Sequence, residues 1–296
     1  MRGSRSGRGV GRREFAGQRV FITGAGGGIG GALAERAAAQ GALLFLTDCD
    51  EDRLAATATR VRAAGGTVVH TAPADIRDHE AVRALAAATH ARGGPMDIVM
   101  NVAGVSAWGT VRGLEHRHWR TMVEVNLMGP IHVIEEFVPS MIDAGRGGHL
   151  VNVSSAAGLL GLPWHAAYSA GKFGLRGVSE VLRFDLRRHR IGVSLVCPGA
   201  VDTPLTETVE IVGVDPADPA VGRLRRRFRR YAATPDEVAV AVLDGVRRNR
   251  YLVHTSSVVR FAHGTQRLCP PLYACLMRLL NRRAHRVLEA VAGSTR

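Results

Sequence analysis

Short apolar runs alternate with longer amphipathic stretches along most of the chain. The short runs are rich in Val, Ile, Leu and Phe and have the length of buried strands, whereas the Ala-, Arg- and Glu-rich stretches repeat their apolar positions with helical period. Strands are predicted at 19–23, 43–47, 67–71, 97–100, 149–153 and 192–196, and the clearest helices at 29–40, 51–64 and 235–247. Thr234 and Pro235 suit the cap and the first residue of the last helix.

Strands and helices that take turns along a chain indicate right-handed crossovers and a parallel sheet with helices on both faces. We therefore expect an α/β, Rossmann-like doubly wound parallel sheet in a single domain at 16–255. A disordered basic tail at 1–15 and an amphipathic basic extension at 256–296 are expected to flank it. Ligands bind beyond the carboxyl ends of the strands in such sheets, so residues directly after strands are the first functional candidates.

The net charge of +13 changes this picture little, because much of it lies at 2–13, at 223–230 and in the extension. No recognition motif accompanies the charge, so a nucleic-acid partner is not expected. The four cysteines lack metal-ligand spacing and are too few for a disulfide scaffold, which indicates the reducing cytoplasm and no metal site. No apolar stretch approaches the roughly 18 residues of a membrane-spanning helix.

The irregular stretch at 200–233 is expected to be a binding loop or lid. Its arginines suit either a solvated helix face, which we favour, or the phosphates of an acyl-CoA or carrier-protein substrate. These arginines are Arg223, Arg225, Arg226, Arg227, Arg229 and Arg230.

The stretch at 270–291 repeats leucines at helical spacing, with arginines between them. We expect this helix to pack on its own domain or on a second subunit of a homodimer or homotetramer. Peripheral contact with a membrane surface is the alternative.

A glycine-rich loop from Thr23 to Gly30 separates the first predicted strand from the first helix. Glycines let the backbone turn tightly and approach a pyrophosphate, and the following helix directs its N–H groups at the negative charge. Asp48 ends the second strand, where a carboxylate accepts hydrogen bonds from the adenosine ribose and repels a 2′-phosphate. The loop carries no Arg or Lys either, so the sequence favours NAD, with NADP as the alternative.

Asp75 follows the third predicted strand and suits the adenine amino group of the same cofactor. Both Asp48 and Asp75 also have an alternative role, which is to cap the helix that follows each of them.

Tyr168 and Lys172 are four residues apart in a predicted helix and share one face, where the lysine charge is expected to favour the phenolate. A tyrosine with a lowered pKa is an acid/base usable near neutral pH. Ser155 follows the strand at 149–153 and is favoured over Ser154, because strand alternation sends the two hydroxyls to opposite faces.

Upstream, Asn126 lies in a helical stretch and Asn101 follows the fourth predicted strand. This ordered set resembles the short-chain dehydrogenase/reductase family over about residues 17–253. The resemblance implies that Tyr168 is the proton donor and acceptor and that Lys172 lowers its pKa and holds the nicotinamide ribose. It also implies that Ser155 orients the substrate oxygen and that Asn126 positions a water-mediated proton relay.

The family further implies a set of cofactor contacts and hydride transfer between NAD(P) and a secondary alcohol or ketone. Val102 departs from the family pattern, which often has a second Asn there. The expected cofactor contacts are Thr23, Gly24, Gly28, Ile29, Gly30, Asp48, Asp75, Ile76, Asn101, Ala103, Gly104, Tyr168, Lys172, Pro198, Gly199, Val201 and Thr203.

The apolar segment at 159–164 lies between Ser155 and Tyr168 and indicates a hydrophobic substrate, such as a steroid or a fatty or terpenoid alcohol. Packing beneath the loop is its alternative role. His165 is expected to be a surface residue, because Tyr168 already supplies the acid/base. The competing functions are an NADPH-dependent reductase of an acyl or polyketide intermediate and a non-catalytic cofactor-binding regulator.

Overall fold

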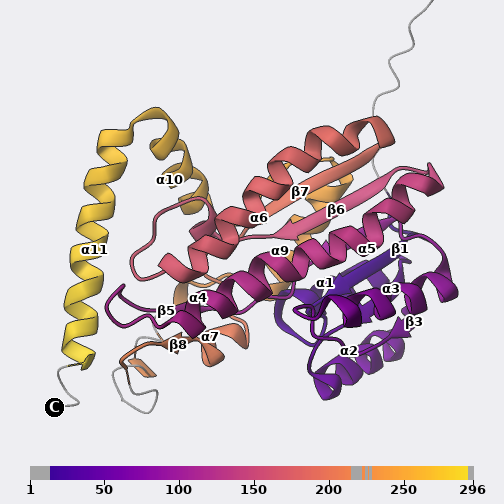
Figure 1. The fold of residues 1–296 in the computed structure, drawn as a ribbon, viewed down its shortest axis with the longest axis horizontal. Helices are drawn as coiled ribbons and strands as arrows, with labels where there is room; N and C mark the ends of the chain where they lie inside the picture. Colours follow the sequence, from indigo (N-terminus) through magenta and orange to yellow (C-terminus); the bar gives the residue numbers. More distant parts are fainter. Residues whose placement is uncertain (1–13, 215–221, 224–225, 227–228, 293–296) are drawn as a thin grey trace, which may run out of the picture.

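A seven-stranded parallel sheet runs through the centre of the molecule, with the strand order β3-β2-β1-β4-β6-β7-β9 (Figure 1). The computed structural model describes residues 14–214, 222–223, 226 and 229–292; the expected tail before residue 14 and Arg225 and Arg227 of the arginine run lie outside them. The strands are β1 (Arg19–Thr23), β2 (Leu43–Thr47), β3 (Thr67–Thr71), β4 (Ile98–Asn101), β6 (Gly148–Val153), β7 (Ile191–Cys197) and β9 (Leu252–His254).

Helices cover both faces of this sheet, so the expected fold class is confirmed. One apolar layer packs against α1 (Gly28–Ala38), α2 (Glu51–Ala63) and α9 (Pro235–Arg247). The opposite layer packs against α3 (His79–Gly93), α5 (Gly129–Ala144) and the end of α6 (Ala166–Asp185). The remaining helical segments are α4 (His116–Val123), η1 (Glu124–Met128), η2 (Ala156–Gly158), η3 (Leu186–His189), α7 (Leu205–Thr208), α10 (Ser257–Leu268) and α11 (Pro270–Ala292).

Strand alternation explains how the two layers form. In β1, Val20 and Ile22 belong to the layer under α1 and α9, whereas Phe21 between them faces the other layer. Phe21 stacks on Phe137 of α5 with 4.2 Å between the ring centroids. The near-continuous apolar run of this strand is therefore the pattern of a sheet buried on both sides.

Several short elements were not predicted. Strand β9 pairs with β7 at the sheet edge, and β5 (Ala107–Trp108) pairs with β8 (Glu210–Ile211) in a separate two-stranded sheet. Elements of two or three residues are too short to show a periodicity. The partner of β5 is β8, which lies far along the chain, so the sequence does not indicate their pairing. Helix α11 begins at residue 270 as expected, but α10 was missed and lies directly before it.

Asp97, directly before β4, links the amino-terminal ends of neighbouring strands at one edge of the sheet. Its Oδ2 accepts hydrogen bonds from the backbone N and the Nε of Arg19, each at 3.0 Å, and its Oδ1 accepts from Arg146 Nη2 at 3.1 Å. Burial acts to raise the pKa of this carboxyl, but the hydrogen bonds and the charges of the two arginines outweigh it and hold the pKa below its usual value.

Replacing Asp97 by Asn should lower the free energy of unfolding by about 2 kcal/mol, because a nearly buried charged hydrogen-bond partner is lost. A carboxylate with a depressed folded-state pKa stabilises the protein above its unfolded pKa of about 3.9, and this stabilisation is lost as pH falls through the folded value. Urea unfolding at several pH values should therefore show a shallower acid loss in the variant. Equal acid losses in the two proteins would contradict this assignment.

Candidate functional site

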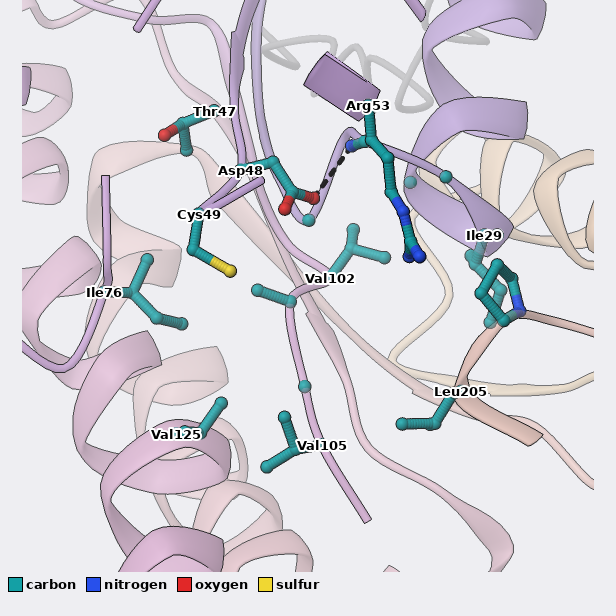
Figure 2. A pocket seen from close by; sticks show the side chains of 18 of the residues that line it. Ile29, Thr47, Asp48, Cys49, Arg53, Ile76, Val102, Val105, Val125 and Leu205 are labelled. Atoms are coloured by element: carbon teal, nitrogen blue, oxygen red, sulfur yellow. Dashed lines mark hydrogen bonds between the residues drawn. The ribbon is translucent and has the colours of Figure 1, made fainter. Parts of the chain in front are cut away.

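A cavity of about 430 Å³ opens where β1, β2 and β4 end. The glycine loop and the start of α1 form one side, and the turns after β2, β3 and β4 form the other sides (Figure 2). Of the expected cofactor contacts, this cavity is lined by Gly24, Gly28, Ile29, Gly30, Asp48, Asp75, Ile76, Ala103, Gly104 and Thr203.

The backbone of the glycine loop is packed so closely that side chains at Gly24 and Gly30 would clash with neighbouring atoms. A Cβ on Gly30 would lie 2.0 Å from the carbonyl oxygen of Gly24, which no side chain tolerates. Gly24 has a φ of +67°, and a Cβ there would come within 2.7 Å of Ala103 Cα. Helix α1 begins after Gly27 with no side-chain cap, so its first N–H groups are open to the cavity. This cradle fits the pyrophosphate of a dinucleotide.

Asp48 lies in the cavity at the end of β2 (Figure 2). Its Oδ2 accepts a hydrogen bond from Gly26 N at 2.8 Å, and its Oδ1 accepts from Asp50 N at 3.0 Å. The capping alternative for Asp48 is wrong, because Asp50 caps α2 by accepting from Arg53 N. The carboxylate is thus held in place by backbone N–H groups next to the glycine loop.

Asp75 does not cap the following helix either, since Asp78 does so by accepting from Glu80 N and Ala81 N. Asp75 instead pairs with Arg77, with 2.6 Å between Oδ2 and Nη2. The hydrogen bond from this guanidinium is the main reason that the pKa of Asp75 is lowered.

Arg53 also lines this cavity, and the sequence reasoning missed it (Figure 2). The expectation that NADP is disfavoured considered basic residues of the glycine loop only. Arg53 enters from the first turn of α2, where its Nε lies 3.1 Å from Asp50 Oδ2. The signal was its position five residues after Asp48, since the first turn of that helix borders the same crevice.

Two of the expected cofactor contacts, Thr23 and Asn101, have structural roles in this fold. The Thr23 hydroxyl accepts hydrogen bonds from Val102 N and Ala103 N at 3.0 and 3.1 Å, which joins the end of β1 to the turn after β4. Asn101 is buried and donates from Nδ2 to Asn152 Oδ1 at 2.9 Å. Neither is among the described residues that line the two cavities, because both are taken up in holding neighbouring strands together.

A second cavity, of about 480 Å³, lies beside the first at the ends of β6 and β7. Ile29, Val102, Gly104, Thr203 and Leu205 line both cavities, so the two spaces share a wall. The structure brings to the second cavity the expected residues Ser155, Tyr168, Lys172, Pro198, Gly199, Val201 and Thr203.

Tyr168 and Lys172 are both buried at this cavity, with exposed fractions of 9% and 3%. Lys172 Nζ lies 5.8 Å from the centroid of the Tyr168 ring and donates to the carbonyl oxygen of Val153 at 3.0 Å. Burial raises the pKa of Tyr168 to about 12, although a hydrogen bond with Ser155 opposes the rise. Burial also lowers the pKa of Lys172 to about 8.

These directions differ from the sequence expectation that the lysine charge lowers the tyrosine pKa. Desolvation disfavours the charged form of each group. It is the largest influence on both pKa values, because both side chains are buried away from water. The Tyr168 phenol is consequently protonated near neutral pH.

Ser154 and Ser155 differ in their surroundings. The Ser154 hydroxyl is buried and donates to the carbonyl oxygen of Lys172 at 3.0 Å. The Ser155 hydroxyl accepts from Ala157 N at 3.1 Å and makes a hydrogen bond with Tyr168. The alternation of the strand end thus leaves Ser155 as the serine whose hydroxyl lies at Tyr168 in the second cavity.

Asn126 lies in a π-helical turn, η1, and is fully buried. Its Nδ2 donates to Val105 O at 2.9 Å and its Oδ1 accepts from Val105 N at 3.2 Å, so it holds the segment after β4. A Cβ on Gly104 would come 2.8 Å from Asn126 Oδ1 and 3.3 Å from Lys172 Nζ. Asn126 therefore stands behind Gly104, and it is not among the described residues that line either cavity.

Apolar side chains form most of the second cavity. Leu160 and Leu162 come from the segment at 159–164, as expected, and Trp108 comes from β5. Helices α10 and α11 supply a further wall of Val258, Val259, Ala262, Met277 and Leu280. The extension after residue 255 therefore packs on its own domain at this cavity.

Tyr273 of α11 fastens this wall to the loop before α6. Its hydroxyl oxygen accepts a hydrogen bond from Gly161 N at 2.8 Å. A second contact lies nearby, where the rings of Trp164 and His285 meet edge to face at 5.7 Å.

The expectation that His165 is a surface residue is wrong. His165 is half-buried and lines the second cavity together with Tyr168. It stands three residues before Tyr168 at the start of α6, so both side chains lie on the same side of the helix. That spacing was the signal that sequence reasoning passed over.

No described helix has both the length and the apolar character needed to cross a lipid bilayer. Within the described residues, no three His, Cys, Asp or Glu side chains are grouped so as to hold a metal ion.

Comparison with known proteins agrees with this geometry. A family model for short chain dehydrogenases matches residues 18–211. "Probable oxidoreductase EphD" of Mycobacterium tuberculosis is 31% identical over 272 residues, which are 90% of this chain and 46% of that protein. The chain thus spans about half the length of this relative.

Two solved structures have similar folds. A short-chain dehydrogenase/reductase of Burkholderia phymatum in complex with NAD is 32% identical with a TM-score of 0.77, covering 86% of this chain and 96% of that one. A variant of the actinorhodin polyketide ketoreductase with NADPH is 29% identical with a TM-score of 0.70, covering 82% of this chain and 97% of that one.

The glycine loop offers a test of the first cavity. Replacing Gly30 by Ala forces a Cβ against Gly24 O, and the overpacking of about 1–3 kcal/mol should weaken NADH binding by about tenfold or more. The matched control is Gly31→Ala, whose Cβ would have no neighbour closer than 3.6 Å. NADH fluorescence titration with a melting curve for each variant measures the effect. Equal NADH affinity in folded Gly30→Ala and Gly31→Ala would remove the loop from the cofactor site.

Proposed function

The chain belongs to the short-chain dehydrogenase/reductase family of NAD(P)-dependent oxidoreductases, and we propose that it interconverts an apolar secondary alcohol and its ketone. The observation that carries the proposal is the shared wall of the two cavities. A dinucleotide lying from Asp48 past Gly104 would end beside Tyr168, Ser155 and Lys172. The cofactor would then reach the carbonyl carbon of the substrate, and the acid/base would reach the oxygen on that carbon.

Tyr168 moves the proton in this proposal. Near neutral pH the phenol is protonated, because burial raises its pKa to about 12, so it is ready to donate to a ketone oxygen. The Ser155 hydroxyl donates a second hydrogen bond to the same oxygen and fixes its position. When bound, the nicotinamide cofactor supplies or accepts the hydride.

Lys172 supports the reverse step, in which the phenolate must form to accept the alcohol proton. Its pKa of about 8 keeps most of the ammonium charged at neutral pH, and that charge favours the phenolate over a distance of a few ångströms. Asn126 acts less directly, because its hydrogen bonds hold the Val105 segment that borders Lys172 and the cofactor cavity. We assign it a positioning role.

The substrate class follows from the walls of the second cavity. Leucines, valines, Met277 and Trp108 surround the few polar groups at Ser155 and Tyr168, which suits a compact apolar ketone or alcohol. Helices α10 and α11 of the extension supply one of these apolar walls. This wall supports a steroid-like, fatty or terpenoid substrate more than a small polar one.

We favour NAD as the cofactor, because the Asp48 carboxylate lines the first cavity beside the glycine loop, where it would accept from the adenosine ribose and repel a 2′-phosphate. The second candidate function is an NADPH-dependent ketoreductase of a polyketide type. Arg53 supports it, since its guanidinium lines the same cavity and suits a phosphate, and so does the likeness to the actinorhodin ketoreductase.

Tyr168→Phe should reduce kcat for ketone reduction at least about a hundredfold, because the proton donor is lost while the ring still fills its site. NADH binding should remain unchanged within twofold, measured by fluorescence. Tyr231→Phe is the matched control, since Tyr231 is 75% exposed and lines neither cavity. Turnover of Tyr168→Phe at the control rate would overturn the assignment of the acid/base.

Asp48→Asn should raise the ratio of kcat/KM with NADPH to kcat/KM with NADH by about tenfold or more. The amide keeps the size of the side chain but removes the negative charge that would repel a 2′-phosphate, while Arg53 in the same cavity keeps its positive charge. Asp52→Asn removes the same charge from an exposed position of α2 and should leave the ratio unchanged. A wild-type preference for NADPH would instead support the second candidate function.

A further inference from the structure

His165 is the polar side chain of the second cavity that the proposed mechanism leaves unused. Three other polar side chains of the lining, Ser106, Ser154 and Thr206, already make hydrogen bonds within the protein. Ser106 Oγ accepts from Trp108 Nε1 at 2.8 Å, and Thr206 Oγ1 donates to Thr203 O at 2.7 Å. Ser154 is engaged with the backbone of Lys172.

The tautomer of His165 follows from its hydrogen bond. Nδ1 lies 2.6 Å from the carbonyl oxygen of Pro163, and because a carbonyl only accepts, Nδ1 must carry the hydrogen. Burial lowers the pKa of His165, although the hydrogen bond to Pro163 opposes this, so the ring is neutral near pH 7. The other nitrogen, Nε2, is then a lone-pair acceptor with no hydrogen-bond partner among the described residues.

The ring is also fixed in orientation. It lies tilted against Trp108 with 4.7 Å between the centroids and meets the Tyr168 ring edge to face at 6.1 Å. Gly109 N, next to Trp108, donates to Trp164 O at 2.9 Å, which ties β5 to the loop that carries His165. Trp164 itself has a φ of +66°, a strained value for a bulky residue, and this bend turns the chain into α6.

We propose that His165 selects substrates that carry a second hydrogen-bond donor, a hydroxyl or N–H group, on the apolar body beyond the reacting carbon. This inference rests on the proposed function, because it takes Tyr168 and Ser155 as the groups that hold the reacting oxygen. Those two groups donate to a ketone oxygen, whereas His165 Nε2 only accepts. The cavity therefore offers donors at one point and an acceptor at another, separated by apolar walls.

The geometry sets the spacing of the two substrate groups. The rings of His165 and Tyr168 are 6.1 Å apart, so the second donor should lie within the span of a bicyclic ketone. An apolar cavity makes the match selective, since a ligand without the donor leaves Nε2 desolvated and unpaired. Hydroxy ketones and the corresponding diols are thus the preferred class, and ketones with a purely hydrocarbon body are poorer.

The test uses 1-tetralone together with its 5-, 6- and 7-hydroxy and methoxy derivatives as probes. With the full-length wild-type enzyme, at least one hydroxytetralone should bind about tenfold more tightly than 1-tetralone, which corresponds to one hydrogen bond in an apolar site. The matching methoxytetralone should show no gain, because it has similar size but no donor. Calorimetry with NADH-bound enzyme gives each Kd, and turnover gives kcat and KM.

Two variants distinguish the hydrogen-bond acceptor role of His165 from the packing of its ring. His165→Phe keeps an aromatic ring against Trp108 and should abolish the hydroxytetralone preference, while the Kd of 1-tetralone changes less than threefold. His165→Gln restores an acceptor oxygen and should recover part of the preference. No side-chain cap is lost in either variant, since His165 makes no capping hydrogen bond for α6, and melting curves confirm that both fold.

The outcomes distinguish this inference from the function on which it rests. A hydroxytetralone preference that persists in His165→Phe, an equal gain from the methoxy group, or no preference in the wild type would overturn the role of His165. Binding with the expected His165 dependence but no turnover with either cofactor would support the acceptor and overturn the proposed function instead. The effect should appear in KM and Kd more than in kcat, as expected of a residue that positions substrate.

Discussion

The whole site depends on the junction between β1 and β4, where the strand order of the sheet reverses. Thr23 at the end of β1 accepts two N–H groups from the turn after β4, and Gly24 lies against Ala103 of the same turn. This junction holds the glycine loop on one side of the crevice and the Gly104 segment on the other. A side chain at Gly24, or the loss of the Thr23 hydroxyl, would move both walls of the cofactor cavity together.

Burial decides the chemistry on the far side of that crevice. Tyr168 and Lys172 are both buried, so the protein disfavours the phenolate and the ammonium alike. The pKa of Tyr168 is raised and that of Lys172 is lowered, and each shift favours the neutral form. The same apolar enclosure gives each remaining hydrogen bond more weight, because unpaired polar groups in it are costly. Helices α10 and α11 complete this enclosure, which joins the chain after residue 255 to the function of the domain before it.

Sequence patterns predicted the strands and helices with strong periodicity, and they identified candidate functional residues whose side-chain chemistry and spacing suit catalysis. The apolar runs located β1, β2 and β3 to the residue, and the Tyr168 to Lys172 spacing placed both side chains at one cavity. The patterns did not show that the side chains of Thr23 and Asn101 join neighbouring strands, because position at a strand end does not distinguish a ligand contact from such a bond. They missed Arg53 and His165 because no motif contains them.

The sequence by itself determined the fold class and located the glycine loop and the proposed acid/base, because these depend on local periodicity and on residues close together in the chain. Only the tertiary structure decided which groups share a cavity and in what protonation state. His165 became an acceptor through the carbonyl of Pro163 and the ring of Trp108, and the pKa of Tyr168 rose through enclosure by distant segments. Desolvation and hydrogen-bond partnership are properties of the assembled neighbours, and linear order does not specify them.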